Sequence, residues 1–340
     1  MVDSYDVAVV GASNSVGELI IELLAERNFP VEKLYLLDSA EAAGGRIEFK
    51  NGYHGIKDVA DFDFSLVQVA LFVAGETLAA KFVPKATQSG CVVVDSSAQF
   101  RMDADVPLVV PEVNSEAVAR YHERNIIASP CSSVIQMLVA LKPIHDAVGL
   151  ESVDVSTYHA VSGAGQSGIE ELASQSANLL NMKEIKSSVF AKQIAFNVIP
   201  QVGAVMENGY TVEELRLIAE SQKVLEDKDI AITPTAVWVP VFFGHSESLH
   251  VKTKEKMSTQ SIRELYSQMP SVEVINEINS FDCPTSVTDG AGSDVIYIGR
   301  IREDISSPNG LNLWVVSDNA RKGGALNSVQ IAENLIKNYL

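Results

Sequence analysis

The sequence predicts an α/β protein with two domains: first a parallel, doubly wound sheet, and then a domain of α+β type. As far as Ile144, short apolar runs alternate with helical patterns, which is typical of parallel strands covered by helices on both faces. Beyond that point, Ser152–Ala160 alternates polar and apolar residues, the pattern of a strand with one wet face. A length of 340 residues accommodates two domains of ordinary size.

Composition and charge indicate what kind of protein this is and which partners it is not expected to bind. Hydrophobic residues make up 46% of the chain and charged residues 21%, which predicts a packed globular core. A net charge of −18 argues against nucleic acid and anionic membranes as partners. Three cysteines, at 91, 131 and 283, form neither a disulfide framework nor a zinc motif, so we expect a reducing compartment and no metal. The sequence lacks a signal peptide and a membrane-spanning run, which predicts a soluble, cytoplasmic protein. The net charge does not decide for or against a small-molecule substrate, which meets only local charge.

The first element is a strand over Tyr5–Val10, followed by a tight loop from Gly11 to Gly17 and a helix over Glu18–Arg27. Strand, glycine loop and helix together open a nucleotide-binding βαβ unit, so we predict a Rossmann-type dinucleotide-binding domain. Only the outer glycines of the three-glycine fingerprint are present, and Asn14 stands at the middle position; a purely structural turn is the alternative. The candidate cofactor contacts in this loop are Gly11, Ser13, Asn14, Ser15 and Val16.

The second strand, Leu34–Asp38, ends on an acidic residue. In dinucleotide-binding folds such a residue accepts the adenosine ribose hydroxyls, so Asp38 with the adjacent Ser39 favours NAD over NADP. A solvated loop acid is an equal alternative. The remaining elements of this domain are a helix from about Thr77 and strands over 66–74, 91–96, 108–111 and 125–128.

A candidate nucleophile lies in Ile126–Leu141. A strand ends at Ala128, Ser129-Pro130 breaks it, and Cys131, Ser132 and Ser133 precede a helical apolar run. The N–H groups and dipole of a helix N-terminus favour a thiolate or a developing oxyanion. The alternative is a capping serine beside a small buried thiol.

Mixed patterning continues to the end of the chain. We expect helices over 169–180, 212–225 and 324–339 and strands over 231–241, 248–252, 295–301 and 311–316. The last helix is expected to pack back on the first domain, which sets the domains at 1–130, 131–320 and 321–340.

Several segments resemble aspartate-semialdehyde dehydrogenases along essentially the whole chain. They are F-R-M-D-A-D-V-P-L-V-V-P-E-V-N at 100–114, I-Q-M-L-V-A-L-K-P at 135–143, A-V-S-G-A-G at 160–165, P-V-F-F-G-H-S at 240–246 and S-D-N-A-R-K-G-G-A-L-N at 317–327. The resemblance implies a Rossmann-type NAD(P)-binding domain, a catalytic and dimerisation domain, and a homodimer or dimer of dimers. The implied reaction is NADP-dependent reductive dephosphorylation of β-aspartyl phosphate through a cysteine thioester.

The resemblance also implies residue roles. His245 matches the catalytic histidine and Arg101 the phosphate-binding arginine. Glu220 matches the glutamate that meets the substrate amine, and Lys223 a lysine near the phosphate. From the sequence alone, His245 would be interpreted as a structural residue, and Glu220 and Lys223 as part of an exposed helix face.

The chain departs from the family's N-P-N-C-S-T motif at its nucleophile. Ungapped alignment places Ser132 at the nucleophile position and moves Cys131 one residue earlier, which redirects its side chain. A hydroxyl is far less ionised than a thiol at neutral pH. This combination resembles the Usg branch of the family.

Further departures surround the same site. Trp238 replaces the carboxylate-binding arginine, His159 replaces a glutamine, and Glu41 and Glu76 add negative charge near the cofactor phosphates. Three hypotheses follow: a dehydrogenase homologue with impaired activity, an NAD-dependent oxidoreductase acting on a different acyl substrate, and a non-catalytic dimer that binds another protein.

Overall fold

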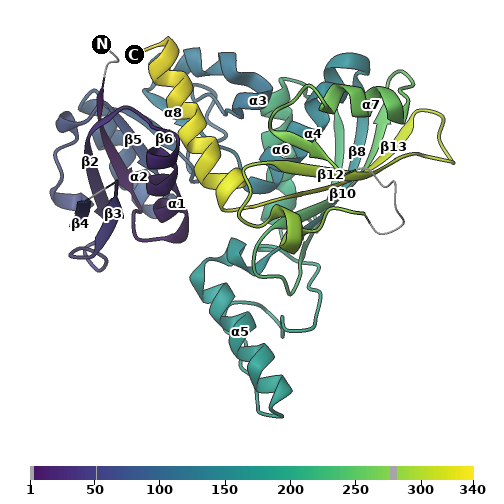
Figure 1. The fold of residues 1–340 in the computed structure, drawn as a ribbon, viewed down its shortest axis with the longest axis horizontal. Helices are drawn as coiled ribbons and strands as arrows, with labels where there is room; N and C mark the ends of the chain where they lie inside the picture. The colour runs from purple at the N-terminus through teal and green to yellow at the C-terminus, as the bar shows by residue number, and fades with distance from the viewer. Residues whose placement is uncertain (1–3, 51, 276–281) are drawn as a thin grey trace. The chain divides into compact units, whose positions relative to one another are not determined.

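The computed structural model describes residues 4–50, 52–275 and 282–340 (Figure 1). The chain forms two compact units. Unit 1 comprises the residues up to Cys131 together with Gly324–Leu340, and unit 2 comprises Ser132–Gly323. The predicted two-domain α/β fold is confirmed.

Unit 1 is built on a seven-stranded sheet in the order β3-β4-β2-β1-β5-β6-β7. All registered pairs are parallel except that of β3 with β4. The strands are β1 (Tyr5–Val10), β2 (Val31–Asp38), β3 (Arg46–Phe49), β4 (Gly52–Asp58), β5 (Val69–Phe72), β6 (Val92–Asp95) and β7 (Ile126–Ala128); the helices are α1 (Ser15–Glu26), α2 (Gly75–Gln88), α3 (Pro111–Asn114) and α8 (Asn327–Asn338).

Helix α8 belongs to unit 1, although it lies at the far end of the chain (Figure 1). Its apolar side chains, among them Val329, Ile331 and Leu335, join the buried core beneath β1 and β2. On its outer side Glu333 accepts two hydrogen bonds from the Arg27 guanidinium of α1.

One expectation for unit 1 was wrong, and one pair of strands was missed. The segment 108–111 forms only an isolated bridge, from Leu108 to Ala128, and α3 begins at Pro111. Proline lacks an N–H and has a preset φ, so it suits the first turn of a helix better than a strand interior. The β3–β4 hairpin was not predicted, because its exposed, mixed sequence has neither an apolar run nor strict alternation.

Unit 2 is built on a mixed six-stranded sheet in the order β11-β12-β13-β10-β8-β9. Its strands are β8 (Leu150–His159), β9 (Ala231–Trp238), β10 (His245–Thr253), β11 (Val272–Val274), β12 (Ile296–Glu303) and β13 (Gly310–Ser317); its helices are α4 (Ser132–Val148), α5 (Gln166–Leu180), α6 (Val212–Leu225) and α7 (Thr259–Tyr266). The predicted bounds of α6 are matched, and a capping box between Thr211 and Glu214 explains its start.

One face of the unit 2 sheet is covered by helices. Helix α4 packs on β8, β10, β12 and β13, and α6 packs on β9. The side chains of β8 and β10 alternate accordingly between buried and more exposed positions. Within the described ranges, no helix is long and apolar enough to cross a membrane.

Candidate functional site

The glycine loop of unit 1 has the close packing of a nucleotide-binding turn. Gly11 has a φ of +92°, which favours glycine, and a Cβ at this position would lie 2.8 Å from the backbone nitrogen of Ala74. A Cβ on Gly17 would lie 2.1 Å from the carbonyl oxygen of Gly11. Both glycines therefore hold the first turn of α1 tightly against β1 and β5.

Asn14 occupies the middle position of the loop and caps α1. Its carboxamide oxygen accepts hydrogen bonds from the backbone N–H groups of Val16 (3.0 Å) and Gly17 (2.9 Å). Its amide nitrogen donates to the carbonyl oxygen of Val73 at 3.0 Å. The helix N–H groups that a pyrophosphate would use are thus engaged by the protein itself.

Asp38 is buried at the end of β2. One carboxylate oxygen accepts from the backbone N–H and hydroxyl of Ser13 at 2.9 and 2.6 Å, and the other from the Ser39 N–H at 2.8 Å. A carboxylate has about four acceptor positions, so it retains room for a ribose hydroxyl. The nearby Glu41 is exposed, and hydrogen bonding from the Ser39 hydroxyl lowers its pKa, so it is ionised at neutral pH.

The residues of the glycine loop and Asp38 fit a dinucleotide, provided that the Asn14 side chain moves. Gly11 and Gly17 supply the turn and Asp38 a ribose acceptor, but the Asn14 carboxamide must release two helix N–H groups before a pyrophosphate can bind them. A bound nicotinamide dinucleotide would supply hydride transfer.

Other candidates of unit 1 lie near the ends of β5 and β6. Arg101 is buried and donates to the backbone carbonyl oxygen of Ser96 at 2.7 Å. Glu76 is exposed in the first turn of α2, and its charge acts on the buried Asp95. Burial raises the pKa of Asp95, which accepts from the Ser97 N–H and hydroxyl.

The division between the units falls between the two candidate nucleophiles. Cys131 closes the first segment of unit 1, and Ser132 is the first residue of α4 in unit 2. A Cβ on Gly323 would lie 2.5 Å from the Cβ of Ser132, so the 317–327 segment approaches Ser132 closely. The next residue, Ser133, is fully buried and donates to Glu213 of α6 at 3.2 Å.

His245 begins β10 and is buried. Its Nδ1 accepts the backbone N–H of Ala160 at 3.1 Å, which places the hydrogen of the neutral ring on Nε2. Burial, reinforced by neighbouring His159, lowers its pKa well below the usual range. At neutral pH His245 is therefore an uncharged hydrogen-bond donor through Nε2.

The departures His159 and Trp238 meet beside His245. They are directly paired at the ends of the parallel strands β8 and β9. The ring centroids of His159 and His245 are 4.5 Å apart, and those of His159 and Trp238 5.6 Å. Phe190 packs edge-on against the indole, with centroids 5.2 Å apart, and Gly163 faces both Trp238 and His245. We call Phe190, Trp238, His159 and His245 the aromatic wall.

The sequence did not identify Asn319 as a site residue. Its side-chain oxygen accepts from the Gly244 N–H and the Ser162 hydroxyl, at 3.1 and 3.2 Å, so it ties the loop before His245 to the loop after β8. Asn319 lies in the S-D-N-A-R-K-G-G segment. This segment contributed to the family resemblance, but none of its residues was assigned a role from the sequence. The same segment brings Gly323 against Ser132.

Glu220 and Lys223 differ in burial along α6. Glu220 is only 1% exposed, which contradicts an exposed helix face at this position, whereas Lys223 is half-buried. Glu220 lies one helical turn from the buried Leu217, on the inward side of the helix.

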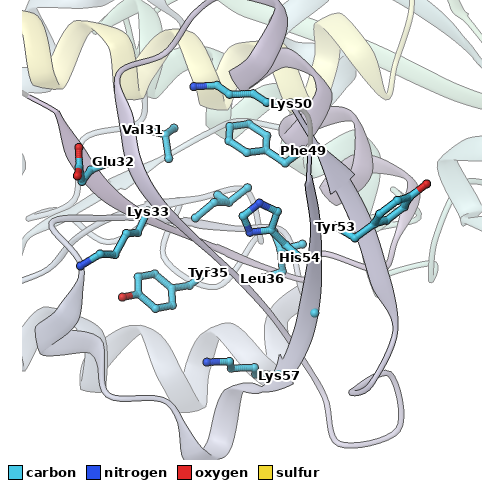
Figure 2. A pocket seen from close by; sticks show the side chains of 12 residues that line it. Val31, Glu32, Lys33, Tyr35, Leu36, Phe49, Lys50, Tyr53, His54 and Lys57 are labelled. Atoms are coloured by element: carbon cyan, nitrogen blue, oxygen red, sulfur yellow. The ribbon is translucent and has the colours of Figure 1, made fainter.

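A cleft of about 590 Å³ lies elsewhere in unit 1 (Figure 2). Strand β4 begins at Gly52 but first pairs with β2 at Ile56, so the two strands diverge and leave the gap. Its lining includes Lys33, Tyr35, Phe49, Tyr53, His54 and Lys57. No predicted site residue is among the described residues that line it.

Two family models match the chain, one in each half. The NAD-binding domain of semialdehyde dehydrogenases matches residues 6–121, and their dimerisation domain matches residues 141–322. The aspartate-semialdehyde dehydrogenase of Shewanella violacea is 51% identical over 339 residues and is covered completely, as is this chain. Aspartate-semialdehyde dehydrogenase 2 of Vibrio cholerae is 48% identical, again with full coverage of both chains.

Solved structures agree with these matches. The crystal structure of Vibrio cholerae aspartate semialdehyde dehydrogenase II, complexed with ASA, has a TM-score of 0.97 and 48% identity. It covers 99% of this chain and 100% of its own. A probable aspartate-semialdehyde dehydrogenase from Pseudomonas aeruginosa has a TM-score of 0.95 at 37% identity, with the same coverage.

Proposed function

Because the chain belongs to the aspartate-semialdehyde dehydrogenase family, we propose that it is a divergent, Usg-type member with impaired activity on aspartate semialdehyde. The aromatic wall carries this proposal. Trp238 stands where the resemblance implies the arginine that binds the α-carboxylate, and its indole packs against Phe190 and His159. Hydrogen bonds to charged groups contribute about 1.5–3 kcal/mol each, so losing a bidentate arginine weakens substrate binding on the order of tenfold or more.

The candidate nucleophile supports the same conclusion. A serine needs a neighbouring base, whereas a thiol of low pKa attacks as the thiolate. Nδ1 of His245 is engaged by Ala160 and Nε2 carries the hydrogen, so the neutral ring offers no free lone pair to Ser132. His245 is arranged to donate to an acyl oxygen instead, as an oxyanion donor does.

The wall also favours a different acyl substrate. Its four rings are packed together, and His245 is neutral, so an uncharged aliphatic acyl group matches this surface better than an amino-acid carboxylate. As a second candidate function we infer an oxidoreductase for such a substrate. NAD is the cofactor that Asp38 and Glu41 favour.

Oxidation in the presence of phosphate tests the proposal. Aspartate semialdehyde and butanal, which lacks the amine and carboxylate, are each assayed with NADP and with NAD. We expect wild type to show a lower kcat/KM for aspartate semialdehyde than for butanal. Ser132→Cys combined with Trp238→Arg is expected to reverse that order, and each single variant to shift it part of the way.

Controls separate the alternatives. Cys131→Ala should leave the order of the two substrates unchanged. Efficient wild-type oxidation of aspartate semialdehyde that disappears in Cys131→Ala would overturn the proposal and assign the nucleophile to Cys131. If every variant is inactive and titration shows no dinucleotide binding, the third hypothesis is favoured, a non-catalytic dimer that binds another protein.

A homodimer is part of this proposal. The match to a dimerisation domain covers unit 2, and one face of its sheet carries half-exposed side chains, including Tyr158 and Trp314 with ring centroids 5.5 Å apart. Near α5, Leu180 and Met182 are largely exposed. Ser248→Arg, placed between Ser156 and Trp314 on the sheet face, should convert dimers to monomers in sedimentation experiments; Glu116→Arg in unit 1 is the control.

A further inference from the structure

A buried carboxyl group lies below the aromatic wall and has no part in the proposed reaction. Glu247 is fully buried on β10, two residues after His245 and on the same inward face. Both of its carboxyl oxygens are buried, and neither has a hydrogen-bond partner among the described residues. A buried polar group in this condition costs free energy and calls for an explanation.

The strand register gives Glu247 a polar neighbour. It pairs with Val315 on β13 and with Thr157 on β8. Side chains directly opposite each other on antiparallel strands have Cβ atoms about 4.5–5.5 Å apart, so the Thr157 hydroxyl is within reach of the Glu247 side chain in another rotamer. That hydroxyl lies 2.8 Å from Nε2 of His159.

We propose that Glu247, Thr157 and His159 form a proton relay that begins at a buried carboxylic acid and ends at the histidine pair of the aromatic wall. Glu247 is the positioning residue, because its protonation decides which nitrogen of His159 carries the hydrogen. The inference goes beyond the proposed function, and its test requires no turnover.

The relay has two states. When Glu247 is protonated, its O–H donates to Thr157, Thr157 donates to Nε2 of His159, and the ring hydrogen is on Nδ1. When the relay operates, the Glu247 proton passes to Thr157 and the Thr157 proton to Nε2. The hydrogen on Nδ1 leaves to solvent, so one proton is lost overall and no other bond changes.

The surroundings of Glu247 favour the first state. Burial raises its pKa well above the ordinary value, and among the described residues no charged group counteracts that shift. The strand register places two titratable side chains on the same face, the neutral His245 on β10 and His159 on β8. The neighbouring β13 and α4 contribute Ser317 and Gln136, which bond each other at 2.6 Å. Glu213 of α6 acts on His159, whose pKa burial lowers despite the opposing charge of that carboxylate.

Nuclear magnetic resonance of the full chain with 15N-labelled histidine tests the relay. The His159 signals are assigned by their loss in His159→Gln. On raising the pH, we expect the hydrogen of His159 in wild type to move from Nδ1 to Nε2. Glu247→Gln should leave the His159 hydrogen on the same nitrogen at every pH, because the amide does not titrate. Thr157→Val should abolish the pH response by removing the link.

Ser317→Ala is the matched control, since it removes a buried hydroxyl on the opposite neighbouring strand that bonds to Gln136 and not to Glu247, Thr157 or His159. It should titrate like wild type. The relay would be overturned if the His159 tautomer in wild type did not change with pH. It would also be overturned if either Glu247→Gln or Thr157→Val retained the wild-type change of tautomer with pH.

Discussion

The glycine loop of unit 1 and the aromatic wall of unit 2 differ in how they accommodate their polar side chains. In the loop, Asn14 caps α1, and Asp38 accepts hydrogen bonds from Ser13 and Ser39. In the wall, His159 and Trp238 bring aromatic surface to His245, and Glu247, below the wall, is buried with no hydrogen-bond partner among the described residues. The side chains of Asn14 and Asp38 are thus held by hydrogen bonds, whereas burial of the wall disfavours charge on its histidines.

The largest effect is expected from adding one methyl group in each region. In Gly17→Ala the new Cβ meets the Gly11 carbonyl oxygen at 2.1 Å, so the backbone must move, and we expect about 3 kcal/mol or more of lost stability. In Gly163→Ala the new Cβ lies 3.4 Å from His245 and Trp238, which predicts about 1 kcal/mol or less. Urea unfolding measures both. Gly55→Ala, with open space around it, is the control, and equal losses at 17 and 163 would contradict the comparison.

The second effect concerns Glu247, below the aromatic wall, and depends on pH. The pKa of Glu247 is raised in the folded state, so the folded protein binds its proton more tightly than the unfolded chain does. Its stabilising contribution is complete below the unfolded value near 4.5 and is lost as pH rises toward the folded value. Relative to Glu247→Gln, wild type should lose about 1.4 kcal/mol per pH unit in that window.

Urea unfolding of both proteins at several pH values checks this slope. Asp304→Asn is expected to show the opposite pH dependence of stability. Hydrogen bonds from Ser306, and then from His250, lower the Asp304 pKa to about 2. Its contribution is present above the unfolded value and declines as pH falls. A parallel pH dependence for wild type and Glu247→Gln would show that Glu247 is not held protonated by burial.

The two regions also differ in how far their structure could be predicted. The loop is local in sequence, so the strand, glycines and helix were predictable, and the capped α6 was predicted with its bounds. The aromatic wall depends on the β8–β9 register, which sets His159 opposite Trp238. Such pairing joins residues far apart in the chain, and composition does not encode it. The strand predicted over Leu108–Pro111 was wrong for a related reason, because an apolar run does not distinguish a buried strand from a buried turn.

A smaller effect tests whether the Asn14 side chain competes with a bound pyrophosphate for the N–H groups at the start of α1. Asn14→Gly removes the carboxamide from the Val16 and Gly17 N–H groups, while glycine at a helix N-cap costs only a few tenths of a kcal/mol. We expect NAD to bind about tenfold more tightly, since each released N–H gains about 0.5–1.5 kcal/mol with a phosphate oxygen. Calorimetric titration measures the Kd. Asn28→Gly, just beyond the other end of α1, is the matched control, and an unchanged Kd in Asn14→Gly would mean that the carboxamide does not compete.

The smallest effect concerns the choice between NAD and NADP. Glu41 is exposed and ionised, so its repulsion of a 2′-phosphate is screened by water and salt. Glu41→Gln should therefore improve NADP binding only about two- to threefold, leave NAD binding unchanged, and lose its effect at high ionic strength. Asp38→Asn changes a carboxylate that is buried and hydrogen-bonded to Ser13 and Ser39, and it should weaken NAD binding more than Glu41→Gln improves NADP binding. Paired titrations of the two cofactors at low and high salt separate these contributions. If Glu41→Gln altered NAD and NADP binding equally, the charge would act on the shared pyrophosphate, and the preference for NAD would rest on Asp38 alone.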